Sequence, residues 1–270
     1  MHVTNRGARF VRYDLTPLTV MALWDGYVDM PPSRLRHDGG QPFGVDFPKQ
    51  IPLIDGQLRL SVNAFLVIEN GRHILMDTGA GNAWLPTMGL LHAALAEAGV
   101  SRESIDTIAL THTHTDHVNG LLTPDGSDAF PSLQRIYVPE QEVAIFETKE
   151  RLTRFRRLCV PFGDGFKVTG RITSLQAHGH SVGHSAFAVS GDLDTLLVCG
   201  DFVHVPSVQF GKPDLTWEFD RDQGQARSAR LKLLAHAAAP DVAVAGAHLD
   251  FPGIGRVSRA GDAYRFSEIE

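Results

Sequence analysis

Short apolar runs alternate along the chain with longer runs in which apolar and polar residues are mixed. A short apolar run bounded by polar or glycine residues predicts a strand, whereas a longer run with one apolar face predicts a helix. We expect strands at residues 18–24, 62–69, 73–77, 107–111, 134–138, 172–176, 186–189, 195–199 and 242–245.

Helices are expected at residues 90–98, 140–149 and 221–239. The last of these follows Asp220, with Gln223 three residues on, and this spacing is typical of a capping box. Strands and helices in alternation predict an α/β fold in which helices cover the sheet faces. A composition that is 43% hydrophobic suits one domain over residues 1–270, with the Pro- and Gly-rich segment 31–52 as an irregular surface loop.

Charge and composition exclude several functions. The net charge of −6 gives no basic surface for a polyanion, so we expect no nucleic-acid partner. No stretch approaches the roughly 18 apolar residues of a membrane span, and the first residues lack the apolar core of a signal peptide. We therefore expect a cytoplasmic protein without membrane contact. Cys159 and Cys199 are expected to be buried thiols.

The most informative segment is Thr-His-Thr-His-Thr-Asp-His at residues 111–117, directly behind an apolar strand. His112, His114, Asp116 and His117 place imidazole nitrogens and a carboxylate within reach of one another. Nitrogen and oxygen donors without a thiolate favour zinc or a similar divalent metal. A solvated polar loop is the alternative, and the density of donors argues against it.

Further donors stand at other predicted strand ends. Asp201 follows the strand that ends at Gly200, and His248 follows the apolar run 242–247. Residues 179–184 add glycine-flanked histidines at His180 and His184. Donors at several strand ends converge at one edge of a sheet, so the sequence predicts one metal centre.

These motifs resemble those of the metallo-β-lactamase fold superfamily of hydrolases. The matching segments are His112-x-His114-x-Asp116-His117, Leu75-Met76-Asp77-Thr78-Gly79, Gly179-His180 with His184, Cys199-Gly200-Asp201 and Gly246-Ala247-His248. The resemblance implies an α/β fold, a four-layer αβ/βα sandwich with two mixed sheets and the metals in a cleft at their edge. It also suggests a homodimer.

The resemblance assigns a ligand set for two divalent metal ions, most simply Zn, with Mn, Fe or Co as alternatives. Its members are His112, His114 and His180 on the first ion, Asp116, His117 and His248 on the second, and Asp201 bridging both. Asp77 and His184 are expected to orient these ligands by hydrogen bonds.

The implied reaction is hydrolysis, in which a metal-bridging hydroxide attacks a lactone, carboxylic ester or phosphotriester. Asp116, as a proton carrier, and Asp201 would take part in catalysis. The segment from Gly200 to Phe210 resembles methyl parathion hydrolase and the organophosphate hydrolase-like group, which is related to lactonases. There His204 stands near the position of a tyrosine that steadies the substrate carbonyl in acyl-homoserine lactonases, and we include it in the catalytic set.

Aromatic residues are the candidates for the wall of a small-molecule pocket. We expect Phe43 and Phe47, from the loop at residues 31–52 near the site, together with Trp84 and Phe202.

Three other functions stay open at this stage. A glyoxalase II-like thioester hydrolase would share the early motifs, but those enzymes depend on a C-terminal helical domain for glutathione. A mononuclear iron persulfide dioxygenase would bind one metal. A non-catalytic protein would bind metal without turnover.

Overall fold

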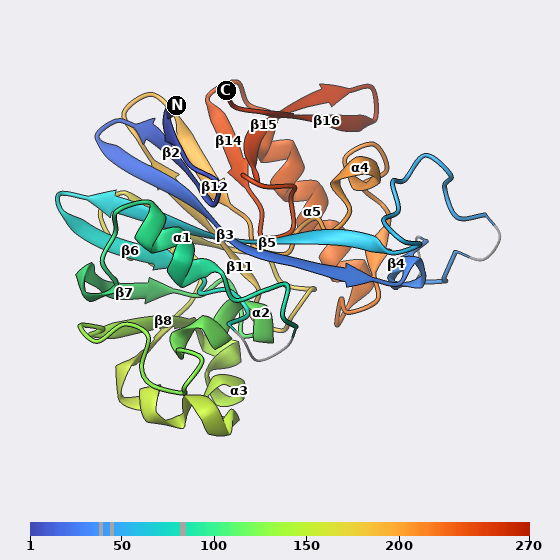
Figure 1. Cartoon of the computed structure of the whole chain (residues 1–270). Helices are drawn as coiled ribbons and strands as arrows, with labels where there is room; N and C mark the ends of the chain where they lie inside the picture. Colours follow the sequence, from blue (N-terminus) through green and yellow to red (C-terminus); the bar gives the residue numbers. More distant parts are fainter. Residues whose placement is uncertain (38–39, 44–45, 82–84) are drawn as a thin grey trace.

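The computed structural model describes residues 1–37, 40–43, 46–81 and 85–270. Its larger sheet has the strand order β1-β2-β3-β5-β6-β7-β8-β9 (Figure 1). The strands are β1 His2–Arg6, β2 Phe10–Leu15, β3 Leu18–Met30, β5 Leu58–Glu69, β6 Arg72–Met76, β7 Ile105–Ala109, β8 Arg135–Pro139 and β9 Cys159–Phe162. Pairing is antiparallel from β1 to β6 and parallel from β6 to β9, so this sheet is mixed.

The second sheet has the order β10-β11-β12-β14-β15-β16. Its strands are β10 Ile172–Gln176, β11 Ser185–Ser190, β12 Thr195–Val198, β14 Val242–Ala245, β15 Ile254–Ala260 and β16 Ala263–Glu268. Only β12 and β14 pair in parallel among these neighbours, so this sheet is mixed as well. A short antiparallel pair joins β4 Leu35–Arg36 to β13 Thr216–Trp217.

The helices between these strands are short, apart from α5. They are α1 Leu91–Glu97, α2 Thr115–Val118, α3 Val143–Thr148, α4 Pro206–Gln209 and α5 Gln223–Ala237. The 3-10 helices are η1 Pro32–Arg34, η2 Arg102–Ser104, η3 Asn119–Leu121, η4 Glu140–Glu142 and η5 Glu150–Leu158. Within the described ranges, each helix is too short or too polar to cross a bilayer.

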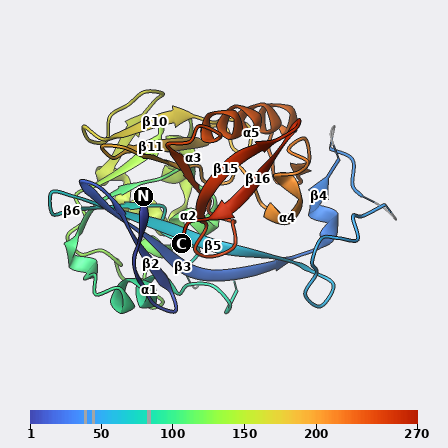
Figure 2. The same ribbon diagram turned by 90° about the horizontal axis from the view of Figure 1, so that it is seen from above.

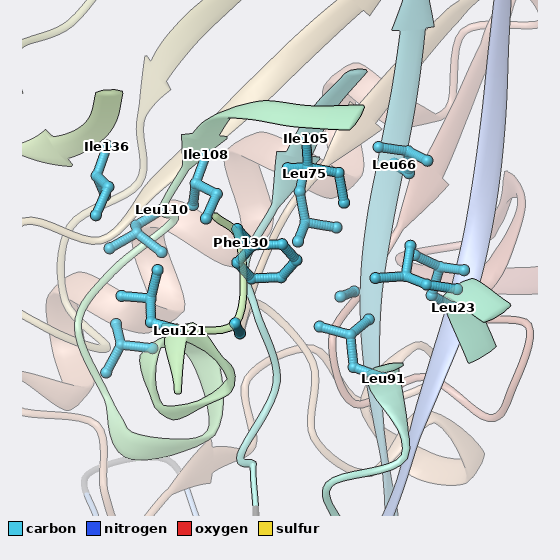
Figure 3. Packing of buried hydrophobic residues seen from close by; sticks show 14 of the residues in the cluster. Leu23, Leu66, Leu75, Leu91, Ile105, Ile108, Leu110, Leu121, Phe130 and Ile136 are labelled. Atoms are coloured by element: carbon cyan, nitrogen blue, oxygen red, sulfur yellow. The ribbon is translucent and has the colours of Figure 1, made fainter. Parts of the chain in front are cut away.

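Buried clusters on both faces of each sheet show why the elements form four layers. Phe65 of the first sheet and Phe187 of the second share the cluster between the sheets. On the outer face of the first sheet, Leu91 of α1 packs with Leu23 and Leu66 (Figure 3). Leu234 of α5 shares a cluster with strands of the second sheet, and Figure 2 shows α5 over that sheet. The α/β prediction with two mixed sheets is confirmed.

Several predicted elements differ in detail from those observed. The last helix begins at Gln223, and its N-cap is Asp222, whose side chain accepts a hydrogen bond from the Gln225 amide. The prediction that Asp220 caps this helix was therefore wrong. The helix expected at residues 140–149 is divided into η4 and α3. The segment 31–52 is not wholly irregular, because it contains η1 and β4.

The long strands β3 and β5 extend beyond their neighbours toward β4 (Figures 1 and 2). The register shifts at Asp25, between Trp24 and Gly26, so Asp25 stands at a bulge. A bulge redirects a side chain out of the regular alternation. The buried Asp25 carboxylate accepts hydrogen bonds from the amides of Ala80 and Leu91, each at 2.8 Å. These hydrogen bonds fix the position of the segment between β6 and α1.

We expect Asp25→Ala to lower the free energy of unfolding by about 3 kcal/mol, because each buried amide left without an acceptor costs about 1–3 kcal/mol. Urea unfolding followed by circular dichroism measures the change. Asp29→Ala is the matched control on the same strand, since within the described ranges the Asp29 side chain pairs with Arg59 alone, at the surface. That pair contributes about 1 kcal/mol or less. Equal losses in the two variants would contradict the role of Asp25.

Candidate metal centre

The predicted donors all lie at strand ends or in the turns that follow them. His112 and His114 follow β7, Asp116 and His117 lie in α2, His180 lies between β10 and β11, Asp201 follows β12, and His248 follows β14. The ligand atoms of His112, His114, His180 and Asp201 lie within 4.8 Å of one another, and those of Asp116, His117 and His248 do likewise. The structure thus brings together residues that are far apart in the sequence.

Asp201 is at the centre of this cluster. Its Oδ2 atom is 3.1 Å from Nε2 of His180 and 3.2 Å from Nε2 of His248. Its Oδ1 atom is 3.0 Å from Nε2 of His117. The two oxygens of Asp201 therefore face different histidines, as a carboxylate must if it is to bridge two ions.

Several buried polar atoms in the cluster have no hydrogen-bond partner, and they indicate whether these residues fit a metal ion. Nε2 of His112, Nε2 of His117 and Oδ1 of Asp201 are buried and make no hydrogen bond within the described residues. Nε2 of His117 and Oδ1 of Asp201 are nevertheless only 3.0 Å apart. A buried polar atom without a partner lowers the stability of the fold. Divalent metal ions satisfy such nitrogen and oxygen atoms, so the residues fit them.

The other ring nitrogen of each of three histidines is held by an oxygen at 2.8 Å. Nδ1 of His117 donates to Asp77, Nδ1 of His180 to Asp220, and Nδ1 of His248 to the Ser61 carbonyl. Such bonds fix the tautomer and the orientation of the ring. In each case the remaining nitrogen, Nε2, faces Asp201.

Asp77 also organises the backbone of the histidine loop. Its carboxylate accepts hydrogen bonds from the amide and the hydroxyl of Thr111, both at 2.8 Å. The backbone of Asp77 has φ of 58°, a conformation that a non-glycine residue adopts only when its surroundings hold it there. The hydrogen bonds to Thr111 and His117 are those surroundings.

His184 lies beside the rings of His112 and His180 and makes its hydrogen bonds to backbone atoms. Its Nδ1 donates to the Ala177 carbonyl at 2.9 Å, and its Nε2 accepts from the Asp201 amide at 3.0 Å. A Cβ atom on Gly200 would lie 2.7 Å from this Nε2, so only glycine fits at that position. His184 thus positions Asp201 through its backbone.

The charges within the cluster shift the protonation of its histidines in opposite directions. Burial acts to lower the pKa of His180, but the carboxylates of Asp201 and Asp220 outweigh it and raise the pKa to about 9. Burial lowers the pKa of His204 to about 4, although Asp201 opposes this. Near neutral pH, His204 is therefore neutral.

His204 lies beside the cluster and is buried. Its ring stacks on Trp217, with the centroids 4.9 Å apart, and on His248 at 5.1 Å. Its Nε2 is 3.3 Å from Oδ2 of Asp201, and its Nδ1 makes no hydrogen bond within the described chain.

Glu142 joins two of the ligand-bearing loops. The buried carboxylate accepts from the Thr113 amide at 3.1 Å and from the Thr113 hydroxyl, and its other oxygen accepts from the Gly183 amide at 3.0 Å. Thr113 lies between His112 and His114, and Gly183 lies just beyond His180. One side chain therefore fixes the spacing of both loops.

A cavity of about 430 Å³ opens over the cluster. This volume is within the range of small-molecule sites. Among the described residues it is lined by Val28, Met30, Leu60, His114, Thr115, Asp116, Lys149, His180, Asp201, His204, Trp217, Phe219 and His248. Apolar side chains form one wall, and the His and Asp residues form another.

The aromatic residues expected at the pocket lie elsewhere or outside the described ranges. Phe43 and Phe47 pack edge to face, 5.9 Å apart, against the buried cluster beneath the ends of β3 and β5. Phe202 is buried in the cluster under α5. None of these three is among the described residues that line the cavity. Trp84 lies outside the described residues.

Sequence reasoning missed Asp220, Glu142 and Lys149 at the site, together with the aromatic wall of Trp217 and Phe219. Asp220 and Glu142 are buried acidic residues, and only their partners in space distinguish them from helix caps. A signal for Trp217 and Phe219 was available, because these two aromatic residues stand just before Asp220 in an otherwise polar segment.

Comparison with known proteins agrees with this geometry. The hydrolase AbOPH of the β-lactamase superfamily is 26% identical, with a TM-score of 0.86 over 98% of this chain and 99% of that chain. AidC, a dizinc quorum-quenching lactonase in complex with a product N-hexanoyl-L-homoserine, is 22% identical, with a TM-score of 0.84 over 96% and 97%. A probable metal-dependent hydrolase from Staphylococcus aureus is 20% identical, with a TM-score of 0.74 over 93% and 97%.

No curated relative matches the chain in sequence. The profile of the metallo-β-lactamase superfamily matches residues 58–248, which include every donor of the cluster. By this match over most of its length, the chain belongs to the metallo-β-lactamase superfamily.

Proposed function

We propose that the protein is a dinuclear metal-dependent hydrolase of a lactone or carboxylic ester, with phosphotriesters as a further substrate class. The observation that carries this proposal is the convergence of seven nitrogen and oxygen donors, several of them buried without partners, beneath one cavity. The likeness to the hydrolase AbOPH supports hydrolysis, and the likeness to AidC, a lactonase with bound product, supports a lactone as substrate.

The residues that would hold two zinc ions are His112, His114 and His180 for one, Asp116, His117 and His248 for the other, and Asp201 for both. When bound, such ions polarise a carbonyl or phosphoryl oxygen and lower the pKa of a coordinated water toward neutrality. Asp77, Asp220 and the Ser61 carbonyl keep Nδ1 of His117, His180 and His248 occupied, so that these three rings present Nε2.

In ester hydrolysis the acyl carbon gains the oxygen of water, its bond to the alkoxy oxygen breaks, and that oxygen takes up a proton. Asp116 lines the cavity, where its carboxylate can pass the proton to the leaving oxygen. His204 lines the cavity, and its Nε2 would donate a hydrogen bond to an oxygen of the substrate when the Asp201 carboxylate is bound to metal. Stacking on Trp217 holds its ring in place.

The apolar side of the cavity favours a substrate whose hydrocarbon part lies away from the His and Asp cluster. Val28 and Met30 of β3, Leu60 of β5 and the ring of Phe219 line this side of the cavity. An acyl or alkyl arm that covers them removes apolar surface from water, which favours binding by about 25 cal/mol for each Å² covered.

The function is tested by measuring kcat/KM of zinc-reconstituted protein on a γ-lactone, an aryl ester, a dialkyl aryl phosphotriester and a glutathione thioester. We expect turnover of the lactone or the ester, and a loss of about 100-fold or more in Asp201→Ala, because that carboxylate faces both groups of donors. Elemental analysis should find two zinc ions per chain before the substitution and fewer after it.

Asp241→Ala is the matched control, since Asp241 is exposed at the start of β14 and outside the cavity. It should retain both zinc content and activity. Turnover that survives in Asp201→Ala would overturn the proposal, and preference for the thioester would replace it with a glyoxalase-like function.

A second prediction concerns the link between the ligand loops. Glu142→Gln keeps the size of the side chain but removes the charge and one acceptor. We expect zinc affinity to fall by about 10–100-fold, as is usual when a partner of metal ligands is altered. Competition with a chromophoric chelator measures the affinity.

Glu140→Gln is the same substitution on the exposed side of η4, and it should leave zinc affinity unchanged. Circular dichroism spectra of both variants report whether the fold is retained. Equal zinc affinity in the two variants would show that Glu142 does not position the ligands.

A further inference from the structure

Lys149 is a cation in the cavity that the proposed reaction does not use. It lies at the junction of α3 and η5, is half-buried, and lines the same cavity as His114, Asp116 and Asp201. It is the one lysine or arginine among the described residues that line this cavity. Its position therefore places a positive charge beside any bound substrate.

The charge of Lys149 has no acidic partner in the described part of the chain. By contrast, Arg34 and Arg36 pair with Glu218, which lies between the cavity-lining Trp217 and Phe219. For Lys149, the contacts found are those of its backbone, with Phe146 and Leu152. Its ammonium group is thus free to pair with a ligand.

The remaining walls limit what that ligand is. Val28, Met30, Leu60 and Phe219 offer no hydrogen-bond donor or acceptor in their side chains, so they suit a hydrocarbon segment. The His and Asp cluster suits the group that is hydrolysed. A neutral substrate would fill these two parts and leave Lys149 without a partner.

We propose that the substrate is an anionic ester or lactone, whose carboxylate pairs with Lys149 while its hydrocarbon segment covers the apolar wall. This inference rests on the proposed hydrolysis and adds the charge of the substrate to it. An ammonium–carboxylate hydrogen bond in a partly desolvated cavity is stronger than one between neutral groups. It therefore gives the site a preference for acidic substrates.

The test uses two substrates of equal length that differ in charge, 4-nitrophenyl hexanoate and mono(4-nitrophenyl) adipate. The ratio of kcat/KM for the adipate ester to that for the hexanoate ester is the measured quantity. We expect a ratio of about 10 in the zinc-loaded protein, falling to about 1 in Lys149→Gln. In Lys149→Glu it should fall below 1.

Lys212→Gln is the matched control, because Lys212 is exposed and outside the cavity. It removes the same charge from the chain and should leave the ratio at about 10. A fall of equal size in this variant would show that the preference comes from net charge, and would overturn the proposal.

Binding of the two acids without turnover gives a second readout. Isothermal titration of the zinc-loaded protein with adipate and hexanoate should show about 10-fold tighter binding of adipate, lost in Lys149→Gln. If neither ester is hydrolysed but this difference is found, anion recognition stands and the hydrolase proposal fails. If both esters are hydrolysed at equal rates and both acids bind equally, the hydrolase proposal stands and the role of Lys149 is refuted.

Discussion

The structure depends on the burial of one carboxylate. Asp201 is almost fully buried, and a buried charge is tolerated only where opposite charges, hydrogen bonds or metal ions compensate it. The compensating groups are imidazoles that come from the ends of β7, β10 and β14 and from α2. Both sheets must therefore meet at this edge, which links the packing of the layers to the chemistry of the site.

A chain of contacts extends this constraint to the far side of the second sheet. His180 donates to Asp220, and the guanidinium of Arg230 in α5 lies 3.6 Å from the same carboxylate. Arg230 is itself buried and donates to the carbonyls of Phe202 and Leu215. The helix thus does more than cover apolar surface, because it fixes the acid that orients His180, one of the residues proposed to hold metal.

Central strands such as β12 and β14 could be predicted because they are buried on both faces and consist almost wholly of apolar residues. The outer strands β2, β15 and β16 were missed, since their polar residues interrupt the pattern. Asp220 was assigned to a helix cap because the sequence shows only local spacing, and its partner His180 lies 40 residues away. The residues proposed to hold metal were found because four of them share one short segment.

The residues that line the cavity were not predicted, because which residues line it depends on how distant segments of the chain pack together. Phe43 and Phe47 had the right chemistry for a pocket, yet the same apolar rings pack against each other and against the buried cluster beneath β3 and β5. Lys149 could not be identified from the sequence. The role proposed for it depends on where the junction of α3 and η5 lies against a cavity formed by other segments. The residues proposed to hold metal thus lie in short motifs, whereas Lys149, proposed to recognise the substrate, lies at a junction, and members of one superfamily can share the first while differing in the second.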